Sequence, residues 1–226
     1  QYGQEMRDQA GMVRESTKWD YELRFAEQIP GIVDRGMAIA MSDPKGPVFL
    51  GLPREPLAEA WPEGLSINGP LQAVPTSGHP NPDAVDQAAE MLSGAKTPLI
   101  ICQRSDPAGR ISAAVSELAE KNAIPVVEFL ATQNNLPSDH PMLAGYDVGP
   151  YIGEAEVILD VHAQVPWIQR NHHLMDDAKV IHVGPDPLFS AMPVRSFRNT
   201  LAITADTASA VSAISASMNG GGAATA

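Results

Sequence analysis

The sequence predicts an α/β fold, a doubly wound parallel sheet flanked by helices and preceded by the C-terminal part of another α/β domain. Three observations predict it: short apolar segments alternate with helical patterns in the second half, prolines crowd the stretch before them, and 44% of the residues are hydrophobic. Short apolar strands that alternate with helices are typical of parallel sheets covered on both faces. The hydrophobic content is enough to fill the core that such a sheet requires.

One helix and one strand are expected in the first part of the chain. Apolar residues recur at helical spacing from Pro30 to Met41, and residues 47–52 have the pattern of a short buried strand. Repeated prolines follow, which fix φ and remove a backbone donor, as in an extended linker. The boundaries that we expect are the end of a first domain at 1–55, a linker at 56–80, a central Rossmann-like domain at 81–218 and a flexible tail at 219–226.

The second part begins with a helix signature and continues as alternating elements. Asn81 followed by Pro82 places an N-cap before a proline that suits the first helical position, and predicts a helix over 82–93. Asp106 and Pro107 repeat this signature before a second helix. The other expected elements are apolar strands and a closing helix, at 99–102, 124–129, 157–161, 180–183, 201–203 and 205–217.

Ligands of such sheets bind outside the carboxyl ends of the strands, so the loops there are the candidate sites. The glycine-rich phosphate motifs Gly-x-Gly-x-x-Gly and Gly-Lys-Ser/Thr are absent from the sequence. The strand that ends at Cys102 runs into Arg104 and Ser105, whose donors could join a helix N-terminus in binding an anion. The alternative is that Asp106 simply caps that helix.

Histidine and cysteine supply the other candidates. Asp160 and His162 would point to the same side of a strand, either as a hydrogen-bonded pair that tunes the imidazole or as a strand end without chemistry. His172 and His173 do not have the spacing of a zinc site, so we predict no metal ligands in this chain. Cys102 ends a buried strand, where an unactivated thiol is inert.

Charge and composition exclude several classes of partner. Fifteen Lys and Arg against 27 Asp and Glu give a net charge of −12, which repels phosphate backbones and argues against nucleic acid. Apolar runs such as 98–102 are too short to span a bilayer, so we expect no membrane contact. A single cysteine cannot form an internal disulfide and favours a reducing, cytoplasmic setting. The chain opens on Gln1 rather than Met, from which we expect a piece of a longer protein.

Several segments, in order along the chain, resemble one enzyme family. They are Gln4-Glu5 with Asp8, Gly11-Met12, Arg14 and 17–19, then 46–55, then 124–127, 136–141 with Gly145, and 179–183 with Asp186-Pro187. Together they resemble the acetolactate synthase-like branch of the thiamine diphosphate-dependent enzymes. The first two groups resemble the end of the pyrimidine-binding domain, and the rest resemble the central domain.

The resemblance implies a three-domain parent that decarboxylates a 2-oxo acid, with thiamine diphosphate and Mg²⁺, as a homodimer or tetramer. The family's glutamate beside the aminopyrimidine would lie before Gln1, and its Gly-Asp-Gly to Asn segment, which holds Mg²⁺ and the diphosphate, would lie after Ala226. We therefore expect this chain to be inactive alone. Gln4 matches a glutamine near the reacting carbons and is the catalytic candidate.

The resemblance also implies that FAD could occupy the central domain in a structural role, with Arg104, Ser105 and Asp186 as its candidate contacts. Two departures count against FAD. Gln103-Arg104-Ser105 replaces a glycine-rich turn, and His162-Ala163-Gln164 replaces Gly-Ala-Arg, which removes a permissive glycine and a phosphate-binding arginine. The alternative to a parent enzyme is a stand-alone module that binds FAD, ADP, a CoA ester or another protein.

Overall fold

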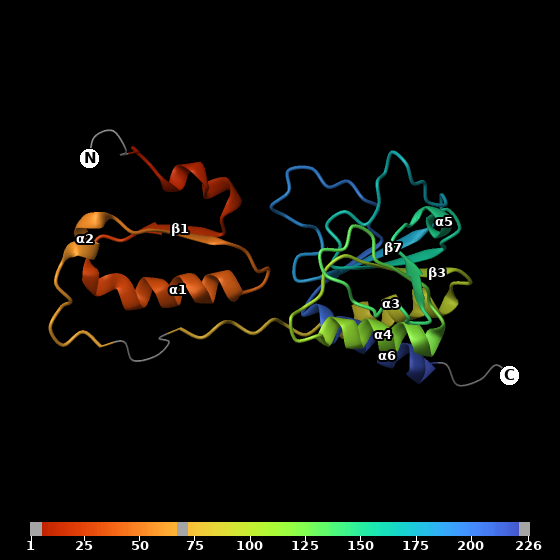
Figure 1. Ribbon diagram of the computed structural model, residues 1–226. Helices are drawn as coiled ribbons and strands as arrows, with labels where there is room; N and C mark the ends of the chain where they lie inside the picture. The colour runs from red at the N-terminus through yellow and green to blue at the C-terminus, as the bar shows by residue number, and fades with distance from the viewer. Residues whose placement is uncertain (1–5, 67–71, 222–226) are drawn as a thin grey trace. The chain divides into compact units, whose positions relative to one another are not determined.

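The computed structural model describes residues 6–66 and 72–221, which form two compact units that divide between Ser77 and Gly78 (Figure 1). In the described residues between Ala58 and Pro82 the chain forms no helix or strand. The expected domain boundaries near residues 55, 80 and 218 stay predictions.

The first unit is a helix packed on a two-stranded parallel sheet. Its elements are three short 3₁₀ helices (Ala10–Met12, Arg14–Ser16 and Ala26–Gln28), β1 (Trp19–Glu22), α1 (Ile29–Met41), β2 (Val48–Gly51) and α2 (Arg54–Ala58). Strands β1 and β2 pair in parallel. The expected helix and strand are confirmed as α1 and β2, whereas β1 was not predicted.

A glycine lets α1 approach this small sheet closely. A Cβ at Gly36 would lie 3.4 Å from the Trp19 ring and 3.7 Å from a Val48 methyl. A larger side chain there would therefore push the helix away from β1 and β2. The segment before β1 is tied to it by Arg14, whose guanidinium bonds Asp8 at 2.9 Å and Asp20 at 3.0 Å.

The second unit is built on a six-stranded parallel sheet. Its elements are α3 (Pro82–Gly94), β3 (Pro98–Cys102), α4 (Arg110–Asn122), β4 (Val126–Val127), β5 (Leu143–Gly145), α5 (Gly149–Ile152), β6 (Val157–Val161), β7 (Lys179–Gly184), β8 (Leu201–Thr204) and α6 (Thr207–Gly221). The strand order is β5-β4-β3-β6-β7-β8. This order confirms the predicted doubly wound parallel sheet and places its switch point between β3 and β6.

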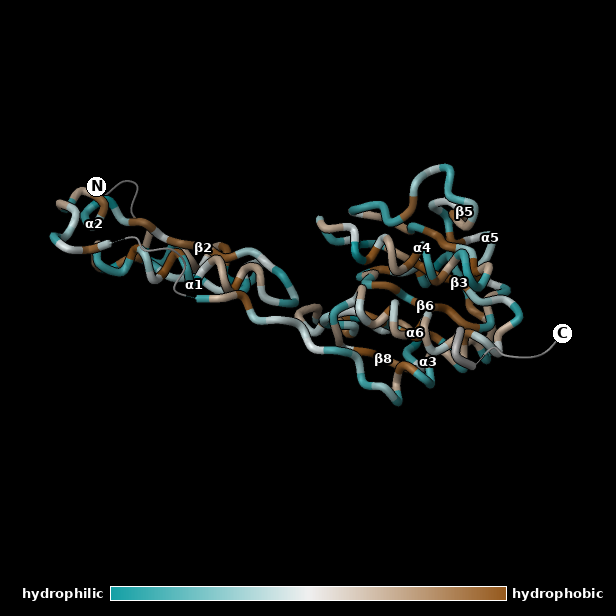
Figure 2. The backbone as a smooth tube through the Cα atoms, turned by 90° about the horizontal axis from the view of Figure 1, so that it is seen from below, coloured by the Kyte–Doolittle hydropathy of each residue, from teal (hydrophilic) through white to brown (hydrophobic). Residues whose placement is uncertain are grey.

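The two faces of this sheet are covered differently (Figure 1). Helices α3, α4 and α6 lie together on one face, over a core that includes Ile100, Leu118 and Val211. The other face packs Ile101 and Ile158 against α5 and against Trp167, which lies in the connection after β6. In Figure 2 the brown colour of β6 and β8 shows that these strands are hydrophobic. Both faces are buried, as the near-continuous apolar strands predict.

The helix signatures have different outcomes. At α3 the side chain of Asn81 accepts from the N–H groups of Asp83 and Ala84, which confirms the predicted cap. The expected start of α4 directly after Asp106 was wrong, because α4 begins at Arg110. Gly109, at φ 70°, turns the chain just before the helix, while the Asp106 carboxylate still accepts from Ile111 N–H at 2.8 Å.

Strand β4, at Val126–Val127, is shorter than the expected 124–129, and the two residues before it offer no N–H to a neighbouring strand. Pro125 has no N–H, and Ile124 N–H donates to Ala119 at the end of α4. No helix within residues 6–66 and 72–221 is long and apolar enough to cross a membrane.

Candidate functional site

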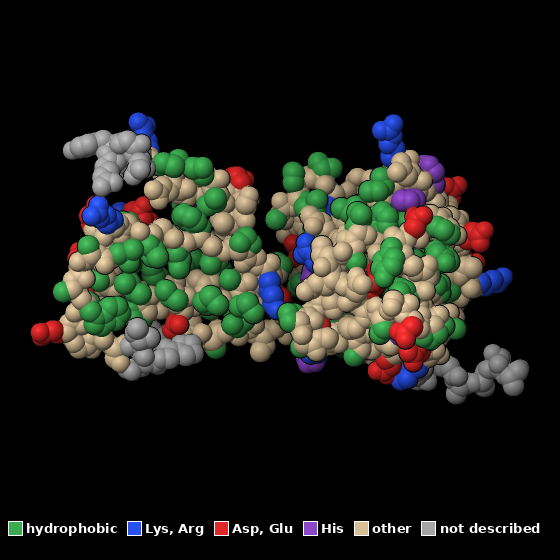
Figure 3. Space-filling model, in the orientation of Figure 1, with side chains coloured by type: hydrophobic (Ala, Val, Ile, Leu, Met, Phe, Trp, Pro, Cys, Tyr) green, Lys and Arg blue, Asp and Glu red, His purple; other side chains and the backbone are tan. Residues whose placement is uncertain are grey.

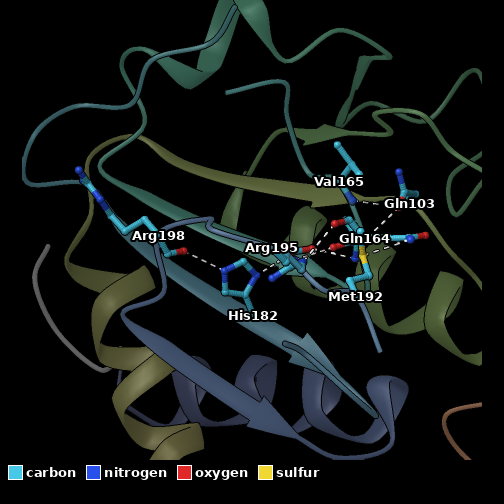
Figure 4. A network of polar contacts seen from close by, with 9 residues as sticks. Gln103, Gln164, Val165, His182, Met192, Arg195 and Arg198 are labelled. Atoms are coloured by element: carbon cyan, nitrogen blue, oxygen red, sulfur yellow. Dashed lines mark hydrogen bonds and ion pairs between the residues drawn. The ribbon is translucent and has the colours of Figure 1, made fainter. Parts of the chain in front are cut away.

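The carboxyl ends of the parallel strands lie at one edge of the sheet. Polar residues gather there in the loops that follow the neighbouring strands β3 and β6. Gln103 follows β3, and its side chain is only 5% exposed. Its Oε1 accepts from the N–H groups of Gln164 at 2.8 Å and of Val165 at 3.4 Å, just after β6. Its backbone oxygen accepts from Thr132 N–H at 2.8 Å. Gln103 therefore joins the loops that follow three different strands, and Figure 4 shows its side chain directed at Gln164 and Val165.

Asp160, in β6, is the buried carboxylate of this edge. Its side chain is 2% exposed, and Oδ1 accepts from Ala163 N–H at 2.8 Å. Oδ2 lies against Nδ1 of His182, its register partner in β7, and 3.2 Å from Nη2 of Arg195. His182 Nε2 also bonds the Arg198 carbonyl at 2.9 Å, so both ring nitrogens have a hydrogen-bond partner. A buried charge held this way is compensated by its partners.

Arg195, which is labelled in Figure 4, lies in the connection between β7 and β8, residues 185–200, and bonds Asp160. Its side chain is 5% exposed, with further hydrogen bonds to the backbone oxygens of Ala163 at 2.9 Å and Gln164 at 3.1 Å. The guanidinium lies over the rings of Phe189 at 4.9 Å and Phe197 at 5.1 Å. Burial lowers the pKa of Arg195, while Asp160 acts in the opposite direction.

Two of the three predicted cofactor contacts lie near this network. Arg104 donates to Gln164 Oε1 at 3.0 Å and lies over the Phe189 ring at 5.6 Å. Asp186 accepts from both the N–H and the hydroxyl of Ser190, at 2.7 and 2.8 Å, so its Oδ2 closes a turn. Their roles as cofactor contacts stay predictions.

Ser105 and Gln4 complete the candidate set. The N–H of Ser105 donates to Gln133 Oε1 at 3.3 Å, in the loop after β4. Ser105 therefore lies at the same edge, and its role also stays a prediction. Gln4 lies outside the described residues.

The imidazole that bonds Asp160 is that of His182, in the neighbouring strand β7, whereas the strand pattern suggested His162. Strand β6 ends at Val161, and His162 adopts φ 52°, so the side-chain alternation stops before it. The ring of His162 lies 6.0 Å from that of Phe189. A signal for the true pair was present, since Asp160 and His182 are lone polar residues near the ends of neighbouring apolar strands.

Glu128, after β4, is a second buried carboxylate that the sequence analysis did not identify. It is fully buried, and Oε1 accepts from Leu136 N–H at 2.9 Å and from Asn135 N–H. Burial, followed by the charges of Glu128 and Asp160, raises the pKa of the Cys102 thiol well above its usual value. This supports the prediction of an inert cysteine. Within the described ranges, no three His, Cys, Asp or Glu side chains form a group that could hold a metal ion.

Comparison with known proteins identifies a matching family. The family described as "Thiamine pyrophosphate enzyme, central domain" matches residues 85–214, a range that contains all six strands of the large sheet. Two curated relatives are similar to this chain over 198 and 136 residues. The probable 2-ketoarginine decarboxylase AruI of Pseudomonas aeruginosa is 29% identical over 198 residues, covering 81% of this chain and 33% of the relative.

The other comparisons agree with this match. Acetolactate synthase large subunit IlvG of Mycobacterium tuberculosis is 31% identical over 136 residues, 60% of this chain and 25% of that protein. The crystal structure of benzoylformate decarboxylase from Polynucleobacter necessarius has a TM-score of 0.71 at 26% identity, covering 88% of this chain and 38% of that one. The chain thus spans well under half the length of these proteins.

Proposed function

The chain belongs to the thiamine pyrophosphate enzymes through their central domain, and from that premise we propose that it is the central region of a thiamine diphosphate-dependent enzyme acting on 2-oxo acids. The parent enzyme decarboxylates the acid and passes the resulting carbanion to a carbonyl acceptor or to a proton. The observation that carries the proposal is the family match at 85–214, which coincides with the sheet of the second unit. Relatives named as decarboxylases and as an acetolactate synthase support this reaction class.

The described residues do not themselves fit the cofactor's metal. Mg²⁺ takes oxygen ligands in a near-octahedral arrangement, and no suitable group of carboxylates is present within residues 6–66 and 72–221. When bound elsewhere in the parent, thiamine diphosphate supplies the electron sink for the carbanion. The role that we assign to the second unit is a rigid domain with a locked carboxyl edge, which braces the assembly; we assign no acid, base or metal ligand to its described residues.

We assign the first unit to the end of a pyrimidine-binding domain. A two-stranded sheet is marginal on its own. Helix α1 leaves an apolar stripe uncovered, in which Val33, Met37 and Met41 are 42%, 59% and 46% exposed. Hydrophobic side chains gather over this part of the unit in Figure 3. This exposure supports a unit that is completed by further structure in the parent.

The test is release of CO₂ from a panel of 2-oxo acids with thiamine diphosphate and Mg²⁺. We expect none from the 226-residue chain and cofactor-dependent release from the product of the complete reading frame. A complete product that binds the cofactor and releases no CO₂ from any acid would contradict the reaction class. The stand-alone module, in contrast, predicts that the chain itself binds FAD, ADP or a CoA ester.

A further inference from the structure

In a doubly wound sheet, the crevice at the switch point is where a ligand is expected. Here that crevice lies outside β3 and β6, between Gln103-Arg104-Ser105 and His162-Ala163-Gln164. Backbone N–H groups and an arginine at such a place commonly hold the phosphates of a nucleotide. The contacts of these groups therefore decide whether a nucleotide can bind.

We propose that the connection between β7 and β8, residues 185–200, permanently occupies this crevice, so that the domain binds neither FAD nor ADP. The proposal concerns this domain alone and holds whether or not the parent has the proposed activity. Phe189, Met192 and Arg195 are the occupying side chains.

Four donors of the crevice are already engaged, namely the N–H groups of Gln164 and Val165, one guanidinium nitrogen of Arg104 and the side-chain amide of Gln164. Gln103 Oε1 accepts from the N–H groups of Gln164 and Val165, the backbone donors just beyond β6. The Arg104 guanidinium bonds Gln164 Oε1 and faces the Phe189 ring. Gln164 Nε2 lies 3.3 Å from Met192 Sδ, within hydrogen-bond reach of a sulfur acceptor. A phosphate would have to displace each of these contacts, and each displacement costs free energy.

Three residues near the end of the occupying segment, Arg195, Phe197 and Arg198, anchor it to the rest of the domain. Arg195 bonds Asp160 and two backbone oxygens, and Phe197 packs edge-on against Trp167 at 5.0 Å. Arg198 bonds the carbonyls of Met175 and Ala178 at 2.8 and 2.9 Å. Opening the crevice would leave Asp160 without its arginine in a buried site, which is strongly unfavourable. The segment is therefore a fixed part of the fold.

The first test is titration of the 226-residue chain with FAD, followed by fluorescence, and with ADP, followed by calorimetry. We expect no saturable binding of either ligand up to about 1 mM, a limit that corresponds to a weak Kd. Saturable binding of either one overturns the proposal.

A second test separates filled space from unsuitable residue types. The double variant His162→Gly/Gln164→Arg restores the permissive glycine and the arginine. It removes the side-chain contacts of these two residues with Phe189 and Met192, but keeps the anchors of the occupying segment at Arg195 and Arg198. We expect it to bind neither ligand. Binding by this variant would show that residue type alone excludes the nucleotide, which also overturns the proposal.

Amide exchange measured by NMR needs no ligand and reports whether water reaches the N–H groups that Gln103 holds beneath the segment. We expect slow exchange at the N–H groups of Gln164 and Val165, and at least tenfold faster exchange in Phe189→Ala, which loses the ring packed on Arg104 and Arg195. The matched control is Leu188→Ala, whose side chain is 55% exposed, and whose exchange should equal that of the wild type. Fast exchange at these amides in the wild-type chain would show that the segment opens freely, against the proposal.

Discussion

Asp160 connects three elements of the sheet's carboxyl edge through one carboxylate. It faces a histidine of the next strand and an arginine 35 residues further along the chain. Such a group cannot be removed without leaving its partners buried and unsatisfied. At the scale of single residues, the architecture therefore depends most on this side chain.

Replacement of Asp160 by Asn should reduce the free energy of unfolding by about 3 kcal/mol or more, because it removes the carboxylate that is directly paired with the buried Arg195 charge. The measurement is urea unfolding followed by Trp167, in a chain whose Trp19 and Trp61 are replaced by Phe. The exposed Glu90→Gln serves as control and should stay within about 0.5 kcal/mol of the parent. Equal stability of the two variants would contradict the assigned role of Asp160.

Asp206 predicts a pH dependence with a definite sign. Burial raises its pKa, but hydrogen bonds from Arg110 and Ser209 outweigh burial and lower the pKa to about 2, from 3.8. Because the pKa of Asp206 is lower in the folded chain than in the unfolded one, its carboxylate stabilises the fold at pH values above the unfolded pKa of 3.8. This stabilisation is lost as the pH falls through about 2. At about pH 6 we expect Asp206→Asn to be less stable by about 1 kcal/mol, since the Arg110 side chain is 57% exposed and screened by water.

The same variant supplies the check on this assignment. The difference in unfolding free energy between Asp206→Asn and the wild type should shrink towards zero as the pH approaches 2. A difference that does not change with pH would assign the effect to packing and not to the carboxylate.

At the residue scale, the sequence predicted which residues lie at the carboxyl edge, but not which of them are hydrogen-bonded to one another. Arg104, Ser105 and Asp186 all lie there, because strand ends are visible in the apolar pattern. The pair of Asp160 with His182 depends on the register between two strands, and Arg195 depends on the path of a loop without periodicity. Neither is encoded in local spacing, so both became visible only in the folded chain.

Helix α4 shows how a single backbone position sets the limits of an element. Gly109 precedes it at φ 70°, and Ala123 follows it at φ 52°, both in the left-handed region. Glycine adopts this region without strain, whereas an L-residue pays about 1–2 kcal/mol. The same left-handed conformation is therefore adopted without strain by glycine at the start of α4 and with strain by alanine at its end.

Substitutions at these two positions should have opposite effects. Gly109→Ala should lower the free energy of unfolding by about 1 kcal/mol, since a Cβ there meets no atom within 4 Å and only the backbone strain remains. Ala123→Gly should raise it by about 0.5 kcal/mol, because strain relief exceeds the added freedom of the unfolded chain. Chemical unfolding of both variants is the measurement, and effects of the same sign would contradict this account of the helix ends.

Most elements were predictable because their signals are local. The cap at Asn81 and the apolar strands β3, β6 and β7 follow from neighbouring residues alone. Strand β1 was missed because Trp19-Asp20-Tyr21-Glu22 is half polar, and β5 because three residues carry no periodicity. These strands exist through pairing with partners distant in sequence, which overrides their weak intrinsic preference.

At the scale of the whole molecule, the two units differ in how completely they bury their apolar surface. The second has cores on both faces of its sheet, whereas the first exposes Val33, Met37 and Met41 along α1. Exposed apolar stripes on helices commonly mark contacts with other structure. The chain alone is therefore expected to self-associate through its first unit.

Met37→Lys places a charge in the middle of this stripe and should reduce self-association without lowering stability. Light scattering after size-exclusion chromatography, over a series of protein concentrations, gives the average mass. Glu27→Lys, at an exposed polar position of the same unit, shifts the net charge further in the positive direction than Met37→Lys does, and should still behave as the wild type. A wild-type chain that stays monomeric at every concentration would contradict the expectation.

The central claim is that this chain is the middle of a thiamine diphosphate-dependent enzyme, and the most direct measurement is the sequence of the reading frame beyond both of its ends. The account predicts a glutamate in a pyrimidine-domain context upstream of Gln1 and a Gly-Asp-Gly to Asn segment downstream of Ala226. A start codon and a stop codon directly flanking these residues would contradict it.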